Sequence, residues 1–162
     1  MFNQLYPNRE IFGFEASPLN YIHLHRNTMN YPNTTNLCVG LGAEQGLNSI
    51  THFVENMGGS GIREVNNLRH KERDIIPIII EPLDLFQLES NISLIKIDVE
   101  NYESYVIKGA HKTIEKHKPM IWIEEIKHDD ANSNSTVKYL VDNFKYEIIN
   151  KSEGNFLLKT QI

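Results

Sequence analysis

Carboxylate side chains stand where three short apolar runs of the sequence end. These residues are Glu15, Asp98 with Glu100, and Glu124 with Glu125. A carboxylate can accept hydrogen bonds from hydroxyl groups and serve as a general base, and ligands of open parallel sheets bind at the carboxyl ends of the strands. The recurrence therefore predicts a binding or catalytic site. For each acid taken alone, the alternative is that it only stabilises the N-terminus of the following helix.

Lys96 interrupts an apolar run two residues before Asp98. Side chains alternate along a strand, so we expect Lys96 and Asp98 on the same face. A lysine there is costly unless its ammonium group is paired. We predict Asp98 as its partner, with Glu124 on the neighbouring strand as a second choice. The alternative is a lysine that extends to solvent at the end of the sheet.

Strands and helices alternate along the chain and must position these acids. We predict strands at 11–14, 37–39, 94–99 and 120–123, and helices at 18–30, 102–118 and 137–144. Ser17 and Pro18 are typical of a helix start, and Pro119 of a helix end. A hairpin is predicted from 146–149 and 156–158. The pattern predicts a mainly parallel sheet with helices on both faces and this hairpin as an antiparallel edge.

The middle of the chain has less regular patterns. The stretch 45–57 fits a helical stripe or a strand face, and we favour a strand that pairs with 75–80. Pro77 would place that second strand on an edge of the sheet. Two glycine clusters, Gly40-Leu41-Gly42 and Gly58 to Gly61, are interpreted as turns, because glycine is the commonest turn residue.

The composition limits the class of protein. The 162 residues are 40% hydrophobic and carry a net charge of -5 without a basic stripe, which indicates one globular domain and argues against nucleic acid as a partner. No run is apolar enough to span a membrane, and the first residues lack the features of a signal peptide. The one cysteine, Cys38, excludes a disulfide framework, favours the cytoplasm and is predicted to lie in the core. The segment 128–135 is predicted to be a polar loop.

Glu15 raises a question about a nucleotide site. In nucleotide-binding folds such an acid accepts hydrogen bonds from ribose hydroxyls, about 20 residues after a glycine-rich turn. Counting back from Glu15 passes the first residue of the chain, Met1. We therefore expect the central first strand and its glycine loop to be missing, which makes the domain truncated at its N-terminus.

Three segments resemble the FkbM family of S-adenosylmethionine-dependent methyltransferases. The run LIKIDVENYESYVIKGAHKTIEKHKPMIWIEEI resembles the family's strand, acidic turn, helix and strand. The segments GFEASPLNYIHLHRN and IIEPLDLF resemble its second strand with helix and the segment before its fourth strand. Asn101 stands where the family has glycine, and asparagine tolerates the left-handed backbone that such a turn requires.

The resemblance implies an α/β, Rossmann-like class I methyltransferase fold, with residues 1–162 as a single domain that is partial at its N-terminus. It implies methyl transfer from S-adenosylmethionine to a hydroxyl of a small-molecule or carbohydrate acceptor, with no nucleic acid or membrane partner. The implied cofactor-binding residues are Glu15, Ala16, Ser17 and Asp98, and the implied catalytic residues are Asp98, Glu100 and Glu124.

Other interpretations stay open. The chain could be a non-catalytic remnant or binding module of the same fold that lacks the cofactor loop, or a Rossmann-type enzyme that uses a nucleotide sugar. A hard cation held by Asp98, Glu100 and Glu124 is the less favoured alternative to a site without metal. The sequence leaves a homo-oligomer open.

Overall fold

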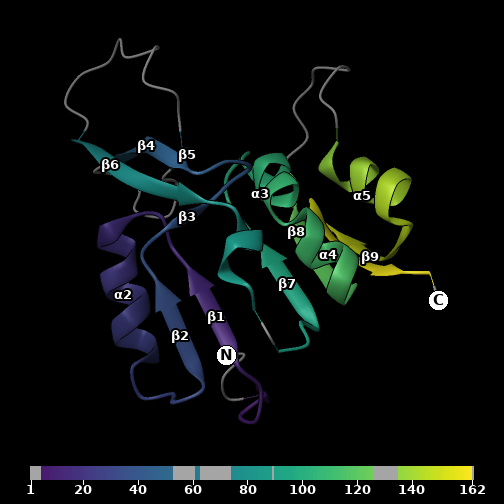
Figure 1. Ribbon diagram of the computed structural model, residues 1–162, viewed down its shortest axis with the longest axis horizontal. Coiled ribbons are helices and arrows are strands. Elements are labelled where there is room, and N and C mark those ends of the chain that lie inside the picture. The colour runs from purple at the N-terminus through teal and green to yellow at the C-terminus, as the bar shows by residue number, and fades with distance from the viewer. Residues whose placement is uncertain (1–4, 53–60, 63–73, 89, 126–134, 162) are drawn as a thin grey trace. The chain divides into compact units, whose positions relative to one another are not determined.

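The computed structural model describes residues 5–52, 61–62, 74–88, 90–125 and 135–161 (Figure 1). Contacts between residues divide the chain into two compact units. Unit 1 comprises residues 1–41 and 45–81, and unit 2 comprises residues 42–44 and 82–162. Both units mix strands with helices or turns, so the chain is an α/β protein. The single domain predicted from the sequence stays a prediction.

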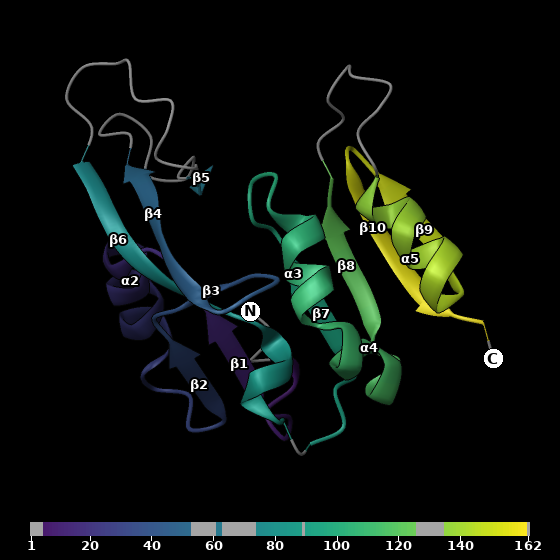
Figure 2. The same cartoon turned by 45° about the horizontal axis from the view of Figure 1, so that its top comes forward.

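Unit 1 begins with two parallel strands joined by a helix. Strand β1 (Ile11–Phe14) pairs with β2 (Thr34–Leu37), and α2 (Pro18–Thr28) connects them (Figure 2). The predicted start of α2 is confirmed, because the Ser17 side chain accepts a hydrogen bond from the Asn20 N–H and proline occupies the first helical turn. No residue of α2 is buried. The helix therefore leaves apolar side chains in contact with solvent.

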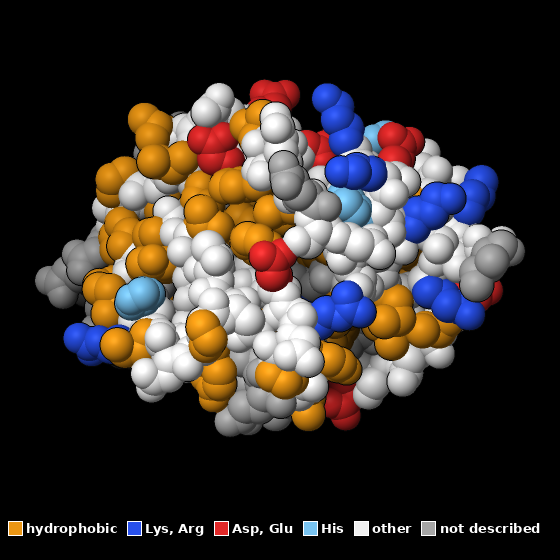
Figure 3. All heavy atoms as spheres, turned by 60° about the horizontal axis from the view of Figure 1, so that its bottom comes forward, with side chains coloured by type: hydrophobic (Ala, Val, Ile, Leu, Met, Phe, Trp, Pro, Cys, Tyr) orange, Lys and Arg blue, Asp and Glu red, His pale blue; other side chains and the backbone are white. Residues whose placement is uncertain are grey.

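Exposed hydrophobic side chains are common on this protein. On α2, Leu19 is 49% exposed and Ile22 is 46% exposed, and Met29, which caps the helix, is 65% exposed. On the face of the molecule drawn in Figure 3, hydrophobic side chains gather in patches between the charged ones. No helix in the described part of the chain is long and apolar enough to cross a membrane.

The strand predicted at 37–39 is wrong in its bounds. β2 ends at Leu37, and the next strand, β3 (Gly40–Leu41), lies where a turn was predicted. The prediction missed the start of β2 because its first residues are polar and form no apolar run, although they pair with β1. Cys38 lies between the two strands and is exposed, so its predicted place in the core is also wrong.

The second sheet of unit 1 has the strand order β3-β6-β4-β5. Its further strands are β4 (Gly46–His52), β5 (Gly61–Ile62) and β6 (Asp74–Glu81). The predicted strand in 45–57 and its pairing with 75–80 are confirmed, and the pairing is antiparallel. The edge position predicted from Pro77 is wrong, because β6 lies between β3 and β4. However, β3 pairs only with Ile80 and Glu81, so Pro77 lies where β6 has β4 alone as its partner.

Unit 2 is built on one sheet with the order β7-β8-β10-β9. Its strands are β7 (Leu94–Ile97), β8 (Met120–Glu124), β9 (Tyr146–Ser152) and β10 (Asn155–Thr160). β7 and β8 are parallel, and the other pairs are antiparallel. The predicted C-terminal hairpin at the sheet edge is thereby confirmed.

Three helices lie on the same face of this sheet (Figure 2). They are α3 (Glu103–Gly109), α4 (His111–His117) and α5 (Thr136–Phe144). Ile107, Ile121, Ile123, Leu140 and Leu158 are 0% exposed between the helices and the strands. The sheet therefore has a continuous apolar core on one side.

A break at Ala110 separates α3 from α4, where one helix was predicted. The Asp84 carboxylate, in the short helix η2 (Leu83–Phe86), accepts hydrogen bonds from the N–H groups of Lys112 (2.9 Å) and Thr113 (2.8 Å). It thus caps the second segment as an N-cap side chain would. The chain is also closely packed just before the break, since a Cβ on Gly109 would lie 1.8 Å from the Gly42 carbonyl oxygen.

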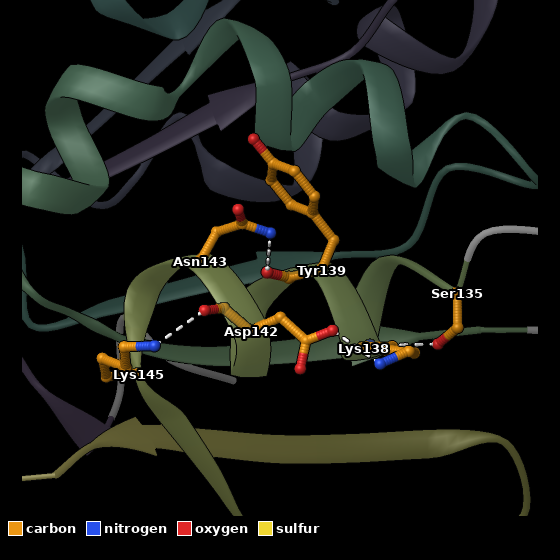
Figure 4. A network of polar contacts seen from close by, with 6 residues as sticks. All are labelled: Ser135, Lys138, Tyr139, Asp142, Asn143 and Lys145. Atoms are coloured by element: carbon orange, nitrogen blue, oxygen red, sulfur yellow. Dashed lines mark hydrogen bonds and ion pairs between the residues drawn. The ribbon is translucent and has the colours of Figure 1, made fainter.

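The predicted helix at 137–144 is confirmed as α5, whose outer face carries a polar network (Figure 4). The Ser135 hydroxyl accepts a hydrogen bond from the Lys138 N–H at 3.1 Å, and the Lys138 ammonium lies 2.6 Å from the Asp142 carboxylate. The Lys145 ammonium donates to the Asp142 carbonyl at 2.9 Å. Each such surface pair stabilises a helix by only about 0.3–0.5 kcal/mol, so the buried face provides most of the stability.

The mainly parallel sheet with helices on both faces is not confirmed. The described strands make three parallel pairs and four antiparallel pairs, in three sheets. In the described part of unit 2, helices cover one face only. Residues 58–60 of the predicted glycine turn and 128–134 of the predicted polar loop lie outside the described residues.

Candidate functional site

The carboxyl ends of β7 and β8 bring Asp98 and Glu124 together. The two strands are parallel, and Ile97 pairs with Ile123, so the next residue of each strand lies side by side. The Asp98 and Glu124 carboxyls are close enough for each to shift the pKa of the other. The closeness predicted for these two acids is therefore confirmed by the strand order.

Lys96 is the cationic member of this cluster. Its ammonium lies 2.7 Å from Asp98 Oδ2 and 5.7 Å from the centroid of the Trp122 ring. The side chains of Lys96 and Asp98 are 40% and 46% exposed. The predicted ion pair is confirmed, and the ammonium also reaches solvent, as the alternative reading expected.

The environments of the two acids move their pKa values apart. The hydrogen bond and charge of Lys96 lower the pKa of Asp98, and Glu124 adds a smaller lowering. Together these effects outweigh burial, which raises the pKa. The negative charge of Asp98 raises the pKa of Glu124, with further increases from burial and from Glu100. The pair therefore holds one proton over a range of acidic pH, with Asp98 as the anion and Glu124 as the acid.

The turn after Asp98 has an unusual backbone. Glu100 and Asn101 have φ values of 49° and 74°, so both residues are in the left-handed region. This confirms the left-handed turn expected at Asn101. The Asn101 N–H donates to Glu103 Oε1 at 3.0 Å, and Glu103 is 8% exposed, so burial raises the pKa of its carboxyl. A buried carboxylate thus holds the turn that carries Glu100.

The neighbouring glutamates 124 and 125 have different roles. Glu125 accepts hydrogen bonds from the Thr136 N–H, from the Val137 N–H at 3.4 Å and from the Ser135 hydroxyl at 2.7 Å. It therefore caps the N-terminus of α5. Glu124 interacts instead with Asp98, whose negative charge raises its pKa.

Trp122 and Asn155 belong to the same surface and were not among the predicted site residues. Trp122 pairs with Lys96 in the register of β7 and β8 and is 37% exposed. Its indole Nε1 donates to Asn155 Oδ1 at 3.1 Å. The sequence signal was the alternation of side chains along β8, which places Trp122 on the other face of the sheet from the buried Ile121 and Ile123.

The other predicted cofactor residues lie in unit 1, at the end of β1. Glu15 Oε1 accepts a hydrogen bond from the Ser17 N–H at 2.8 Å. Ser17 is fully buried and caps α2, while Ala16 packs against the apolar cluster around Ile50. A shared site of these residues with Asp98 stays a prediction. Among the described residues, no group of three or more His, Cys, Asp or Glu side chains could hold a metal ion.

Comparisons with known proteins agree on one family. The model of the methyltransferase FkbM domain matches residues 2–148. The crystal structure of a methyltransferase FkbM from Methylobacillus flagellatus KT is similar with a TM-score of 0.60 and 17% sequence identity, over 98% of this chain and 39% of that chain. This chain thus spans well under half the length of that protein. No protein of curated function matches the chain.

Proposed function

The chain belongs to the FkbM methyltransferase domain family, and on this premise we propose that it transfers a methyl group from S-adenosylmethionine to a hydroxyl oxygen. The acceptor in this proposal is a sugar or another small metabolite. The observation that carries the proposal is the cluster of Lys96, Asp98 and Glu124 at the carboxyl ends of two parallel strands, where ligands of such sheets bind.

We also propose that the strands belong to a Rossmann-like sheet of class I methyltransferase type. Two features support this. The strands β1 and β2 are parallel and joined by α2, and β7 and β8 are parallel and joined by α3 and α4. A parallel pair needs such a crossover, which is usually a helix.

The residues present fit the cofactor in one respect that can be tested. Glu15 has one oxygen on the Ser17 N–H, and a carboxylate has several further acceptor positions. Glu15 would therefore accept hydrogen bonds from the ribose hydroxyls. Ser17 and Ala16 would hold the Glu15 carboxylate in place, because Ser17 has no exposed surface with which to contact a ligand. The cofactor supplies a methyl group that its sulfonium charge has already activated.

Asp98 is our candidate for the base. As the anion of the pair it would accept a hydrogen bond from the acceptor hydroxyl, fix its direction and take its proton when the oxygen–carbon bond forms. Asp98 would then release this proton to solvent, while the cofactor would supply the methyl group and keep the electron pair of its carbon–sulfur bond. Glu124 and Glu100 would line the acceptor pocket, where their carboxylate oxygens can accept hydrogen bonds from further hydroxyl groups of the acceptor.

The alternative function is a binding module without catalysis. It is supported by the contact of Glu15 with the Ser17 N–H, because a carboxylate that holds the start of α2 has a structural role without any cofactor. In that case the chain would not retain the cofactor.

Calorimetry with S-adenosylmethionine distinguishes the two functions. We expect a saturable heat of binding, reduced roughly tenfold or more in affinity by Glu15→Ala, since a hydrogen bond to a charged group contributes about 1.5–3 kcal/mol. Glu10→Ala, an exposed acid just before β1, serves as the control and should bind as the parent does. No heat at millimolar cofactor would favour the binding module.

A further inference from the structure

We propose that Trp122 is the platform on which the acceptor stacks, and that the acceptor is a neutral ring bearing hydroxyl groups, as in a pyranose. The inference rests on the proposed methyl transfer and adds a contact residue and a ligand shape to it. Its basis is a cluster on one face of the unit 2 sheet, formed by Lys96, Asp98, Trp122, Glu124 and Asn155.

The register of the sheet places the indole on the open face. Trp122 lies opposite Lys96 on β7 and Leu157 on β10, and directly opposed residues share a face of a sheet. Ile121 and Ile123 point to the other face, are 0% exposed and lie under the helices. Trp122 is 37% exposed, so part of its ring is available to a ligand.

Two contacts hold the indole in position. Its Nε1 donates to Asn155 Oδ1 at 3.1 Å, and the Lys96 ammonium lies 5.7 Å from the ring centroid. Lys96 also pairs with Asp98 at 2.7 Å, so one side chain connects the ring to the proposed base. A ring held in advance loses little freedom when a ligand binds, which favours affinity.

The groups beside the ring define the ligand. A Trp ring offers a flat apolar surface with a negatively polarised face, which suits the C–H groups on one side of a saturated ring. Asp98 and Glu124 offer acceptor oxygens to hydroxyl groups at the ring edge. The carboxyl groups of Asp98, Glu100 and Glu124 outnumber the one ammonium of the cluster, that of Lys96, so the cluster disfavours anions. A neutral polyhydroxylated ring satisfies all three conditions.

The fluorescence of Trp122 tests this directly, because it is the one tryptophan of the 162-residue chain. We expect the methyl pyranosides of glucose, galactose or mannose, at millimolar concentration, to shift its emission to shorter wavelength in a saturable way. Sorbitol, which has the hydroxyl groups without the ring, should leave the emission unchanged.

Asn155 variants test the anchoring of the ring. Asn155→Ala should weaken pyranoside binding roughly two- to tenfold, the range expected for losing a well-placed aromatic contact. Asn155→Asp, which keeps an acceptor oxygen, should retain most of the affinity. Asn150→Ala, an exposed position on β9 of the same sheet, is the matched control and should bind as the parent does.

Three results would overturn the proposal. They are an equal response to sorbitol and pyranosides, no response to any of the three pyranosides, and an emission maximum of the free protein already typical of an indole shielded from water. The cofactor experiment is independent of these. Pyranoside binding without cofactor binding would support the platform and overturn methyl transfer, and the reverse result would overturn the platform alone.

Discussion

The two units hold their strand-end acids in different ways. In unit 1, the Glu15 carboxylate is tied to the backbone of the helix that follows it. In unit 2, Asp98 and Glu124 are tied to each other and to Lys96, while Glu125 and Glu103 take the structural hydrogen bonds. An acid fixed by backbone groups suits binding. A pair that shares a proton suits chemistry on a hydroxyl group.

The units also differ in how well their helices are packed. α2 has no buried residue, whereas α3, α4 and α5 each contribute side chains to the core. The Asp98–Glu124 pair therefore lies on a well-packed support. Glu15 lies beside a helix that is held mainly by its cap and its strand.

The largest expected effect is a loss of stability, which we compare between one leucine of each unit. Leu140 of α5 is 0% exposed and Leu19 of α2 is 49% exposed. We expect Leu140→Ala to lower the free energy of unfolding by about 2–5 kcal/mol through loss of burial and formation of a cavity. Leu19→Ala should change it by less than about 0.5 kcal/mol. Urea unfolding measures both, and equal losses would contradict the difference in packing.

The next effect concerns the close approach at Gly109. A Cβ there would lie 1.8 Å from the Gly42 carbonyl oxygen, so Gly109→Ala must displace backbone and should cost about 1–3 kcal/mol. Gly46→Ala is the control, since a Cβ at Gly46 meets nothing within 4 Å. Thermal unfolding should show a clear loss for the first variant and none for the second. A stable Gly109→Ala protein would mean that α3 and Gly42 do not pack as described.

A smaller effect should appear in the pH dependence of stability. The pKa of Glu124 is raised in the folded protein. Protonated Glu124 therefore stabilises the fold fully below the pKa of the unfolded chain, and this stabilisation is lost as pH rises through the pKa of the folded protein. Glu124→Gln should therefore raise the free energy of unfolding at neutral pH, by less than about 1 kcal/mol because the charges are partly screened. The gain should vanish in acid. Urea unfolding between acidic and neutral pH provides the measurement.

Glu147→Gln is the control for that prediction. Glu147 lies 3.2 Å from the Lys159 ammonium on the same sheet, so its carboxylate faces a cation and not a second carboxylate. Its loss should leave the stability at neutral pH unchanged or slightly lower. A gain equal to that of Glu124→Gln would show that net charge, and not the carboxyl pair, is responsible.

The smallest effect concerns the left-handed turn. Asn101 has a φ of 74°, so Asn101→Gly should cost little or raise the free energy of unfolding by at most about 1 kcal/mol. Ser104→Gly, three residues on and inside α3, should lower it by about 0.5–1 kcal/mol. Thermal unfolding distinguishes the two signs. A loss at Asn101 as large as that at Ser104 would contradict the turn geometry.

The sequence predicted the elements whose signals are local. The apolar runs of β1, β7 and β8 and the Ser17 cap of α2 were recognisable because a few adjacent residues determine them. The break at Ala110 was not, because it depends on Asp84, 28 residues before Lys112. The short strand β3 was also missed, since Gly40 is there for close packing, where a Cβ would lie 2.6 Å from Ile80.

The same limit applies to the site. Asp98 and Glu124 could be paired from the sequence, because consecutive parallel strands joined by a helix are often neighbours. Asn155 could not be placed beside Trp122, because that contact depends on β10 inserting between β8 and β9. The roles of Glu124 and Glu125 were likewise inseparable without the position of α5.

Nuclear magnetic resonance titration of the carboxyl carbons of Asp98 and Glu124 tests the central claim most directly. We predict that Asp98 loses its proton at a pH below the usual range of aspartate, and Glu124 at a pH above the usual range of glutamate. In Asp98→Asn, the pKa of Glu124 should return toward its usual value. Two ordinary and independent titrations, or a Glu124 that ionises before Asp98, would contradict the shared proton and with it the assignment of Asp98 as the base.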